Sequence, residues 1–388
     1  MSDHTPLQDW NPQDTEVLAD KRHAYDEMRE RCPVAHSDMM HWSLFRHTDV
    51  VAVINDPDTF INASRHRAIP NSMNGLEHAK HREILAPYFS ASAIAGIEPT
   101  CREIATNTMQ VMPTASEAIA RPGTTDAVAN IAEPIAFGTM CAFLGWPQTM
   151  WERIRDWSHS NHASTVNPDT KSMQMIEEEY TAIVSEALED HRRQNIWDDV
   201  TGKLMMTEVN GHRWNNEDII AVLRNWIAGH GTVTAAISIV IAHLAEDQNL
   251  QRQLREQPQL IPAAIDEILR VDGPLVANTR TTTREVTING RKIPDGERIS
   301  LMWIAANCDP QAFDAPEEIR LERDQQSNLL YGAGIHYCLG APLARLELRV
   351  TIETLLAHTT EISLASPEPL EREIHPGNGF VAIPVHIR

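Results

Sequence analysis

The chain has 388 residues, a formal net charge of −21 at pH 7 and 42% hydrophobic residues. This composition is ordinary for a soluble globular protein and excludes a wholly disordered chain, a collagen-like fibre and a small disulfide scaffold. Because 54 acidic residues outnumber 33 basic ones, we expect neither nucleic acid nor an anionic membrane surface as a partner.

The first half of the chain contains one strand signal followed by long helical patterns. The segment HWSLFRHTDVVAVI has a strand signal that starts with alternation over residues 42–45. Apolar residues recur at helical spacing in 174–193 and again in 217–246, which predicts two helices. Asn216 is the expected N-cap of the second helix.

The second half mixes helices with short strands. A helix is predicted over 258–271 and another over 341–357. Between them, residues 284–304 read as short strands interrupted by the hairpin turn signals Asn289-Gly290 and Asp295-Gly296. The C-terminal segment GFVAIPVHI also alternates. The whole is mainly α with a minor β region, and we expect one domain over 1–388.

Five cysteines are scattered along the chain, an odd number without a CxxC pair. This pattern argues against a disulfide framework and a thiolate zinc site, and it fits a reducing cytoplasm. The N-terminus is polar, without the apolar core of a signal peptide. The uncharged run 231–242 is shorter than the ~20 residues that span a bilayer, so we expect a cytoplasmic protein outside the membrane.

The most informative segment is YGAGIHYCLGAPLAR, residues 331–345. A glycine-rich loop here delivers Cys338 to the start of a predicted helix, where unpaired N–H groups and the helix dipole favour a thiolate. Gly332, Gly334 and Gly340 keep side chains away from the sulfur, so a flat group can approach the backbone. Such a thiolate suits an axial ligand of haem iron. For an isolated cysteine, a buried packing role is the alternative.

The segment resembles the haem-ligand loop of the cytochrome P450 family, FGxGxHxCxGxxLAR, at almost every fixed position. The one departure is Tyr331 in place of the usual Phe. The resemblance runs from about residue 44 to the end of the chain. It implies the family's single triangular, mainly α fold with a small β region, and haem b (iron protoporphyrin IX) held through Cys338, with Tyr331, Gly332 and Gly340 in its binding loop.

Other segments match the family in the same order. Glu267 and Arg270 resemble its ExxR motif, with Arg323 as the third member of a buried network; a solvated charge pair is the alternative. The haem propionates need cationic donors, and the resemblance nominates four residues, each of which in isolation would be an ordinary surface charge. They are His78, Arg82, Arg280 and His336. His81 does not have the spacing that the HxxxR pair requires.

Residues 228–232, Ala-Gly-His-Gly-Thr, resemble the family's oxygen-activating AGx(D/E)T stretch. The resemblance implies that Ala228 lines the haem, that Gly229 leaves room for dioxygen and permits a local kink, and that Thr232 hydrogen-bonds the distal oxygen. The departure is Gly231, which stands where the family has an acid. Cleavage of the O–O bond needs protons, so the proton route must differ.

Three routes remain open for those protons. Thr232 and ordered water suffice, with water in the space at Gly231. Alternatively, His230 substitutes for the acid, although it lies about 100° around the helix from that position. In the third, the protein uses peroxide, which already brings both protons.

The resemblance also suggests which regions face the substrate. They are residues 62–74, 158–173, 227–232 and 275–279. Apolar residues among them, such as Ile227, Leu275 and Val276, suggest an apolar pocket, and plain core packing is the alternative.

Electrons must come from elsewhere, because the chain contains neither a flavin domain nor an iron–sulfur CxxC run. A ferredoxin-type protein or a fused reductase is expected, docking on basic residues. Lys80, Arg82, Arg345 and Arg349 are the candidates.

The predicted activity is monooxygenation of a small apolar or aromatic organic substrate by dioxygen. A second hypothesis, which rests on Gly231, is a peroxide-driven peroxygenase. A third is a non-catalytic haem or ligand-binding protein, against which Gly229 and Thr232 argue.

Overall fold

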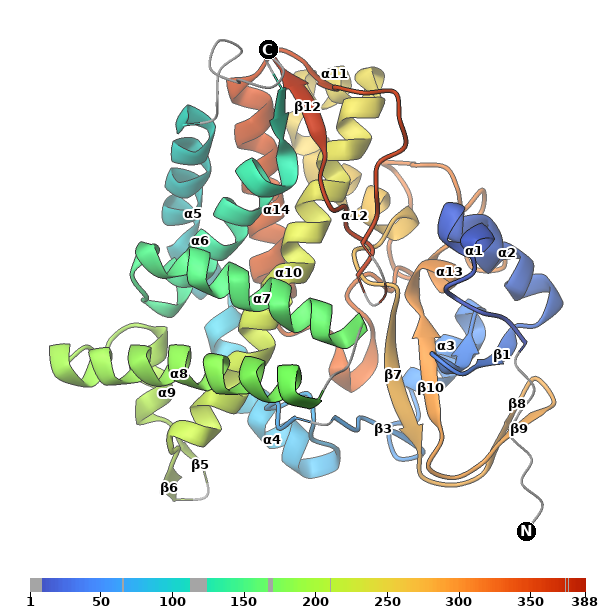
Figure 1. Ribbon diagram of the computed structural model, residues 1–388, viewed down its shortest axis with the longest axis horizontal. Coiled ribbons are helices and arrows are strands. Elements are labelled where there is room, and N and C mark those ends of the chain that lie inside the picture. The colour runs from blue at the N-terminus through green and yellow to red at the C-terminus, as the bar shows by residue number, and fades with distance from the viewer. Residues whose placement is uncertain are drawn as a thin grey trace. The chain divides into compact units, whose positions relative to one another are not determined.

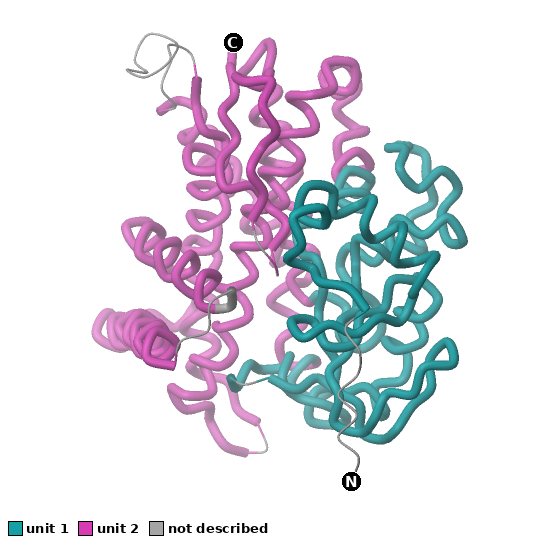
Figure 2. Tube along the Cα trace, turned by 45° about the vertical axis from the view of Figure 1, so that its right-hand side comes forward, with its two compact units in different colours: residues 1–82, 266–338 teal, residues 83–265, 339–388 magenta. Residues whose placement is uncertain are grey.

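The computed structural model describes residues 9–64, 66–111, 124–166, 170–209, 211–373, 375 and 377–388. The structure is 58% helical with a minor strand component. The chain divides into two compact units, and each unit is assembled from two separate segments (Figure 2). The first unit contains residues 1–82 and 266–338, and the second contains residues 83–265 and 339–388.

The first unit carries the larger sheet. Its elements are α1 (Thr15–Ala19), α2 (Lys21–Arg31), β1 (Val34–Ser37), β2 (His41–Leu44), α3 (His47–Ile54), β3 (Phe60–Ile61), β7 (Ala277–Thr282), β8 (Val286–Ile288), β9 (Arg291–Ile293), β10 (Arg298–Met302), α13 (Trp303–Asn307) and the 3₁₀ turn η5 (Gly334–His336). Five strands pair in the order β1-β2-β10-β7-β3 (Figure 1). Only β2 and β10 are parallel, with Ser43 opposite Ser300.

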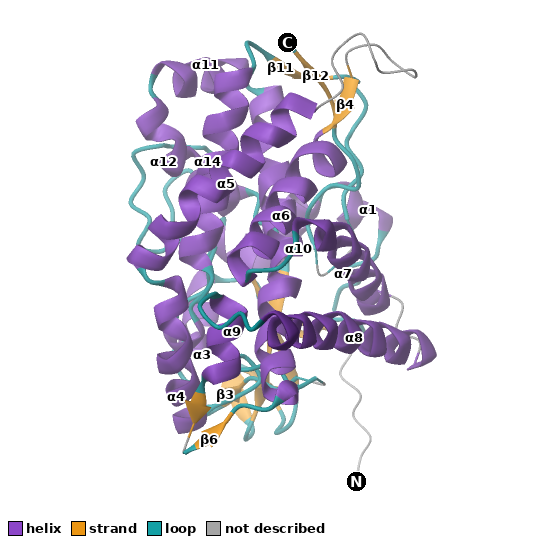
Figure 3. Ribbon diagram, turned by 90° about the vertical axis from the view of Figure 1, so that its left-hand side faces the viewer, coloured by secondary structure: helices purple, strands orange, loops and turns teal. Residues whose placement is uncertain are grey.

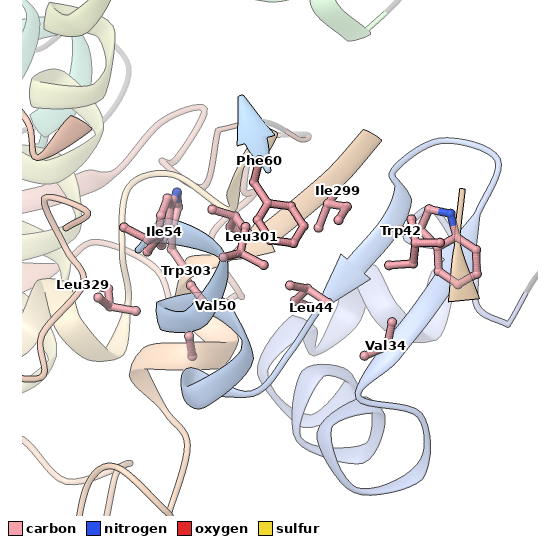
Figure 4. Packing of buried hydrophobic residues seen from close by; sticks show 13 residues of the cluster. Val34, Trp42, Leu44, Val50, Ile54, Phe60, Ile299, Leu301, Trp303 and Leu329 are labelled. Carbon is pink, nitrogen blue, oxygen red and sulfur yellow. The ribbon is translucent and has the colours of Figure 1, made fainter. Parts of the chain in front are cut away.

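A buried apolar cluster fixes this sheet against α3. Leu44 of β2 and Ile299 and Leu301 of β10 are fully buried, and Val50 and Ile54 of α3 pack with them (Figure 4). Burial of each such side chain contributes roughly 1.5–3 kcal/mol. The cluster therefore joins strands that are more than 250 residues apart in the sequence.

The second unit is built mainly from helices. Its elements are η1 (Ala86–Phe89), α5 (Ala91–Val111), β4 (Thr124–Asp126), the π-helix η2 (Val128–Ala132), α6 (Glu133–Leu144), η3 (Gln148–Met150), α7 (Trp151–Val166), α8 (Thr170–Gln194), α9 (Val200–Met206), β5 (Glu208–Val209), β6 (His212–Arg213), α10 (Asn216–Glu246), α11 (Gln248–Glu256), η4 (Pro258–Leu260), α14 (Ala341–His358), β11 (Ile362–Leu364) and β12 (Pro384–Ile387). Two helices, α4 (Gly75–Leu85) and α12 (Ile261–Val271), run through the boundary between the units.

Helix α10 is the longest element of the second unit, and α5, α6, α7 and α14 are packed beside it or beside one another (Figures 1 and 3). Asn215 caps its N-terminus, because the Asn215 side chain accepts a hydrogen bond from the Asp218 amide and Asp218 reciprocates. Such a box satisfies two amide donors at the helix start. By length and composition alone α10 could cross a membrane, but 72% of its most apolar window is buried inside the protein.

The four predicted helices are confirmed as α8, α10, α12 and α14. The expected N-cap Asn216 is wrong by one residue, since Asn215 makes the capping box. Residues 258–260 form a 3₁₀ turn before α12. The strand signal at 42–45 corresponds to β2, but residues 47–54 of the same segment form α3.

The two turn signals have different outcomes. Asn289 and Gly290 both have positive φ and close the β8–β9 hairpin, as predicted. Gly296 also has a positive φ of 78°. However, Asp295-Gly296 connects β9 to β10, which lie in different sheets. This second turn therefore does not form a hairpin.

Candidate functional site

The ExxR motif forms a complete buried network in the first unit. Arg270 Nε donates to Glu267 Oε1 at 2.8 Å, and Arg323 Nε donates to Glu267 Oε2 at 3.0 Å. The Arg320 backbone N–H and Gln325 Nε2 add two further donors, each at 3.0 Å. Burial alone would raise the pKa of Glu267, but these donors outweigh it and lower that pKa.

Arg270 is equally well satisfied. Its guanidinium donates to the backbone carbonyls of Asn307, Pro316 and Glu318, and it lies 4.9 Å from the ring centroid of Phe313. Both Glu267 and Arg270 are fully buried. Since every charge has partners, the network ties α12 to the segment 307–325 without any ligand.

The cysteine loop is shaped by two left-handed glycines. Gly332 and Gly334 have φ of +68° and +66°, a region that disfavours other residues. At Gly334 a Cβ would also lie 3.2 Å from the Ile54 carbonyl oxygen. The Cys338 N–H donates to the Tyr331 carbonyl at 2.9 Å, which closes the loop. The Cys338 residue is exposed, so its sulfur can take an external ligand.

The two other residues predicted for this loop, Tyr331 and Gly340, have different surroundings. The Tyr331 ring lies 6.3 Å from that of Tyr337, centroid to centroid. Gly340 is the residue before α14, in the second unit, with an ordinary φ of −79°. The nearest atom to a Cβ at Gly340 would be Phe89 Cε1 at 3.9 Å, so this part of the second unit does not itself demand a glycine there.

The four predicted propionate donors come together in the first unit. The rings of His78 and His336 lie 4.2 Å apart, centroid to centroid, and Arg82 donates to the carbonyl of Tyr337. Arg280, on β7, is 8% exposed. His81, by contrast, bonds through Nδ1 to the Glu77 carbonyl of its own helix. The role of His78 as a propionate donor stays a prediction.

Among the described residues no carboxylate pairs with this basic cluster, defined as His78, Arg82, Arg280 and His336. Burial lowers the pKa of Arg82, and a thiolate at Cys338 opposes that change. None of the four forms an ion pair with a described carboxylate, and Arg280 Nη1 donates a hydrogen bond to the neighbouring Thr279 carbonyl at 3.0 Å. His78 Nε2 is buried without a hydrogen-bond partner. A buried donor or charge without a partner is costly, so the cluster needs an anion.

The pKa values report the same deficit. Burial, followed by the charges of His78, Arg280 and Arg82, lowers the pKa of His336 to about 3. Burial also lowers the pKa of Arg280 to about 10. Each shift disfavours the protonated form. Burial is the main cause in both residues, and at His336 the neighbouring cations add to it. A haem, with one metal to ligate and two carboxylates to bind, fits the residues present.

Sequence reasoning missed Asn62, which joins this cluster. Asn62 Nδ2 lies 3.2 Å from His336 Nδ1. Its backbone N–H donates to Asn74 Oδ1, and Asn74 Nδ2 donates back to the Asn62 carbonyl, both at 2.9 Å. These bonds tie together the ends of the segment 62–74, which was expected to face the substrate. Residue 65 of that segment lies outside the described part.

In the second unit, the predicted oxygen-activating residues lie in an unbroken stretch of α10. Gly229 is exposed, and a Cβ there would meet no heavy atom within 4 Å. Ala228 and Thr232 are half-buried. Gly229 and Gly231 each destabilise a helix interior by about 1 kcal/mol relative to alanine. The open face of α10 is therefore accompanied by a loss of helix stability.

The His230 side chain is paired with Glu347 of α14. Its Nε2 lies 3.2 Å from Glu347 Oε1 on α14, and its Nδ1 lies 2.7 Å from the Trp226 carbonyl. A carbonyl only accepts, so Nδ1 carries a proton and the pair shares a second one. Burial raises the pKa of Glu347. Burial lowers that of His230, but the Glu347 carboxylate outweighs it and the pKa rises. This pairing argues against His230 as the missing acid.

The expected substrate-facing residues divide into core and accessible positions. Ile227 and Val276 are 1% and 2% exposed and belong to the core, as the plain packing alternative held. Leu275 is half-buried against the cluster beneath the large sheet. Of the predicted segment 158–173, residues 167–169 lie outside the described part.

The candidate docking residues differ in their environments. Lys80 and Arg345 are exposed, and Arg82 is half-buried in the basic cluster. Arg349 forms ion pairs with Glu98 and Glu353 at 2.8 and 3.2 Å. Its charge is therefore already balanced, and it is a poor candidate for a docking patch. Within the described ranges no group of three or more His, Cys, Asp or Glu side chains could hold a metal ion.

Comparisons with known proteins agree with this picture. The family model described as Cytochrome P450 matches residues 26–384. Mycinamicin IV hydroxylase/epoxidase of Micromonospora griseorubida is 30% identical over 89% of each chain, and Cyclomarin C epoxidase CymV of Salinispora arenicola is 28% identical over 87% of this chain and 88% of its own.

A solved structure extends the agreement to the fold. The ligand-free structure of Cytochrome P450 TbtJ1 superposes with a TM-score of 0.86 at 28% identity, covering 95% of this chain and 98% of that one. Proteins of the matched family hold haem, use dioxygen and electrons from a redox partner, and bind organic substrates. The chain belongs to this family, the cytochrome P450 monooxygenases.

Proposed function

We propose that this protein inserts one oxygen atom into a small apolar or aromatic organic substrate. Each turnover combines R–H, dioxygen, two electrons and two protons to give R–OH and water. The electrons come from a separate ferredoxin-type protein or a fused reductase. We further propose that residues 1–388 act as one haem domain in the cytoplasm.

In this proposal the residues have distinct roles. Cys338 ligates the iron, and the loop residues Tyr331, Gly332 and Gly340 leave space beside the sulfur. His78, Arg82, Arg280 and His336 donate to the two propionates. When bound, the haem supplies the metal centre at which dioxygen is reduced. Ala228, Gly229 and Thr232 line the face where dioxygen and substrate meet, and Thr232 holds a proton near the oxygen that leaves as water.

The observation that carries the proposal is the basic cluster without a carboxylate partner, in the same unit as an exposed cysteine on a glycine-shaped loop. The test is the absorbance of the reduced protein with carbon monoxide. We expect the Soret band at the long wavelength typical of a thiolate ligand. Cys338→Ser should abolish that band, and the matched control Cys32→Ser should keep it. A band that survives in Cys338→Ser contradicts the assignment.

The substrate class is tested by titrating the oxidised protein with organic compounds. Relatives of this chain are named Vitamin D(3) 25-hydroxylase and Erythromycin C-12 hydroxylase, at 30% and 28% identity. Vitamin D3 and erythromycin therefore belong in the panel beside small aromatic compounds. A substrate should convert the haem from low to high spin and then yield an oxygenated product. A shift only with highly polar compounds contradicts the apolar class.

The electron donor is tested by the salt dependence of reduction. The exposed Lys80 supports docking of an acidic partner. We expect the rate of reduction by an acidic ferredoxin to fall steeply with ionic strength, and Lys80→Glu to slow it at low salt. Arg349→Gln serves as the control, because Arg349 is half-buried whereas Lys80 is exposed. Reduction that is independent of salt argues against electrostatic docking.

A peroxide-driven peroxygenase is the second candidate, and Gly231 favours it because the family's acid is missing there. Rapid product formation from hydrogen peroxide without any reductase would support this activity. Rapid bleaching of the haem with little product would leave the reductase-driven reaction as the function.

A further inference from the structure

Gly231, which stands where the family has an acid, lies beside a polar side chain of another helix. A Cβ built on Gly231 would lie 3.2 Å from Ser158 Oγ on α7, with no other heavy atom within 4 Å. Helices α7 and α10 are in contact with each other (Figure 1). The Ser158 hydroxyl thus lies close to the place that an acid side chain at position 231 would occupy.

Ser158 is 8% exposed, and among the described residues its hydroxyl has no hydrogen-bond partner. Hydroxyls in helices commonly bond a carbonyl three or four residues earlier. Ser164, also on α7, does so with Asn161, and Thr234 of α10 does so with His230. The Ser158 hydroxyl is not engaged in this way, so it is available to water or to a group near Gly231.

One turn further along α7, His162 lies near Glu373 of the C-terminal segment, since both approach Gly377. A Cβ at Gly377 would lie 2.9 Å from His162 Cε1 and 2.5 Å from Glu373 Oε2. The same carboxylate oxygen would lie 2.9 Å from a Cβ at Gly379, which in turn would be 2.8 Å from Ala235 Cβ of α10. His162 and Glu373 are both partly exposed, so they can exchange protons with solvent.

We propose that Ser158 replaces the absent acid of α10 as the positioning residue for proton delivery. A hydroxyl both donates and accepts, so it passes a proton on without a net change of charge. The space left by Gly231 admits a water between Ser158 and Thr232, and His162 with Glu373 supplies protons from the outside. Both protons end on the oxygen atom that leaves as water. This inference rests on the proposed monooxygenase function.

The first test compares Ser158→Ala, Ser158→Thr and the control Ser164→Ala on the same helix. Ser158→Ala should lower the rate of product formation by about 10²-fold or more, the usual size of general acid–base effects. It should also lower the product formed per reductant consumed and change the solvent deuterium isotope effect. Ser158→Thr should restore these values, because it keeps the hydroxyl. Haem content, the carbon monoxide band and the substrate-induced spin shift should not change in any of the three.

A second test reads the contact without turnover. Gly231→Ala places a methyl group 3.2 Å from Ser158 Oγ, which is a tight approach. Thermal unfolding of the haem-loaded protein is measured for the single variants and for the double variant with Ser158→Ala. We expect a non-additive change in unfolding midpoint, since contacting residues couple. Strict additivity would contradict the contact.

The outcomes separate this inference from the proposed function. If the wild-type protein shows no thiolate band or forms no product, the proposed function fails. If it turns over normally and Ser158→Ala has unchanged coupling and isotope effect, only the role of Ser158 is overturned. If Ser158→Thr behaves like Ser158→Ala in both measurements, the hydroxyl is not the active feature and the inference also fails.

Discussion

Two buried charged clusters of the first unit can be compared directly. The Glu267–Arg270–Arg323 network contains its own counter-charge, and every carboxylate oxygen of Glu267 has donors. The basic cluster around Arg280 and His336 has no described carboxylate partner. A complete network needs no ligand to persist, whereas a one-sided cluster is stable only when something else brings the opposite charge. The comparison distinguishes a structural cluster from a binding one.

The largest expected effect comes from breaking the complete network. Glu267→Gln should destabilise the protein by about 3–5 kcal/mol, because Arg270 and Arg323 would then be buried without a counter-charge. Denaturant unfolding with and without haem measures this loss, and the destabilisation should be similar in both states. As a control, the exposed pair Arg388–Glu361 is removed by Arg388→Ala, with an expected change below about 1 kcal/mol.

The basic cluster should respond in the opposite sense. Arg280→Leu removes a buried cation that has no counter-charge, so the unfolding free energy of the haem-free protein should hold or increase. Haem retention should weaken, since a hydrogen bond to a charged group contributes about 1.5–3 kcal/mol, or roughly 10- to 150-fold in dissociation rate. Haem transfer to an excess of apomyoglobin measures the rate. A haem-free protein destabilised as strongly as by Glu267→Gln would erase the distinction.

The complete network should also give acid sensitivity. The pKa of Glu267 is lowered in the folded state from an ordinary value of 4.5, so the unfolded chain binds a proton more readily. Stability from this group is therefore present above pH 4.5 and is lost as the pH falls below that value. Unfolding midpoints between pH 3 and 7 should fall less steeply with acid in Glu267→Gln than in the wild type. Parallel slopes would remove Glu267 from the acid response.

The smallest expected effects concern one amide in each cluster. Gln325→Ala removes a donor to Glu267 and should reduce stability by about 1 kcal/mol, with or without haem. Asn62→Ala removes the group beside His336 and should act mainly on haem retention. Unfolding of both variants should be measured with and without haem. An equal loss of stability in all four measurements would contradict the distinction between the two clusters.

The cysteine loop and most helices can be predicted from the sequence, because their patterns lie within short segments. The spacing within 331–345 identifies the cysteine loop, and the four-residue interval to Arg82 selects His78 over His81. The N-cap error is also local: Asn215 and Asn216 are the same residue type, and only the reciprocal bond with Asp218 decides between them. The Val-rich run 47–54 favours a strand by composition but packs as a helix against the sheet.

The contacts that the sequence does not reveal are those between distant segments. Glu347 lies 117 residues from His230, and Ser158 is 73 positions before Gly231. Neither pair has a spacing that a local pattern could register. Gln325 joins the Glu267 network from 58 residues away. Such partners depend on how helices cross, and only the folded structure supplies that information.

The segmental make-up of the first unit has a consequence for synthesis on the ribosome. Strand β2, residues 41–44, waits for β10, residues 298–302, before its parallel pairing can form. At ~5–20 residues per second, that delay lasts tens of seconds. During this time β2 is paired only with β1, and the apolar cluster around Leu44 and Val50 lacks Ile299 and Leu301 of β10. The nascent chain is therefore more exposed to chaperones and proteases before β10 has left the ribosome than after it.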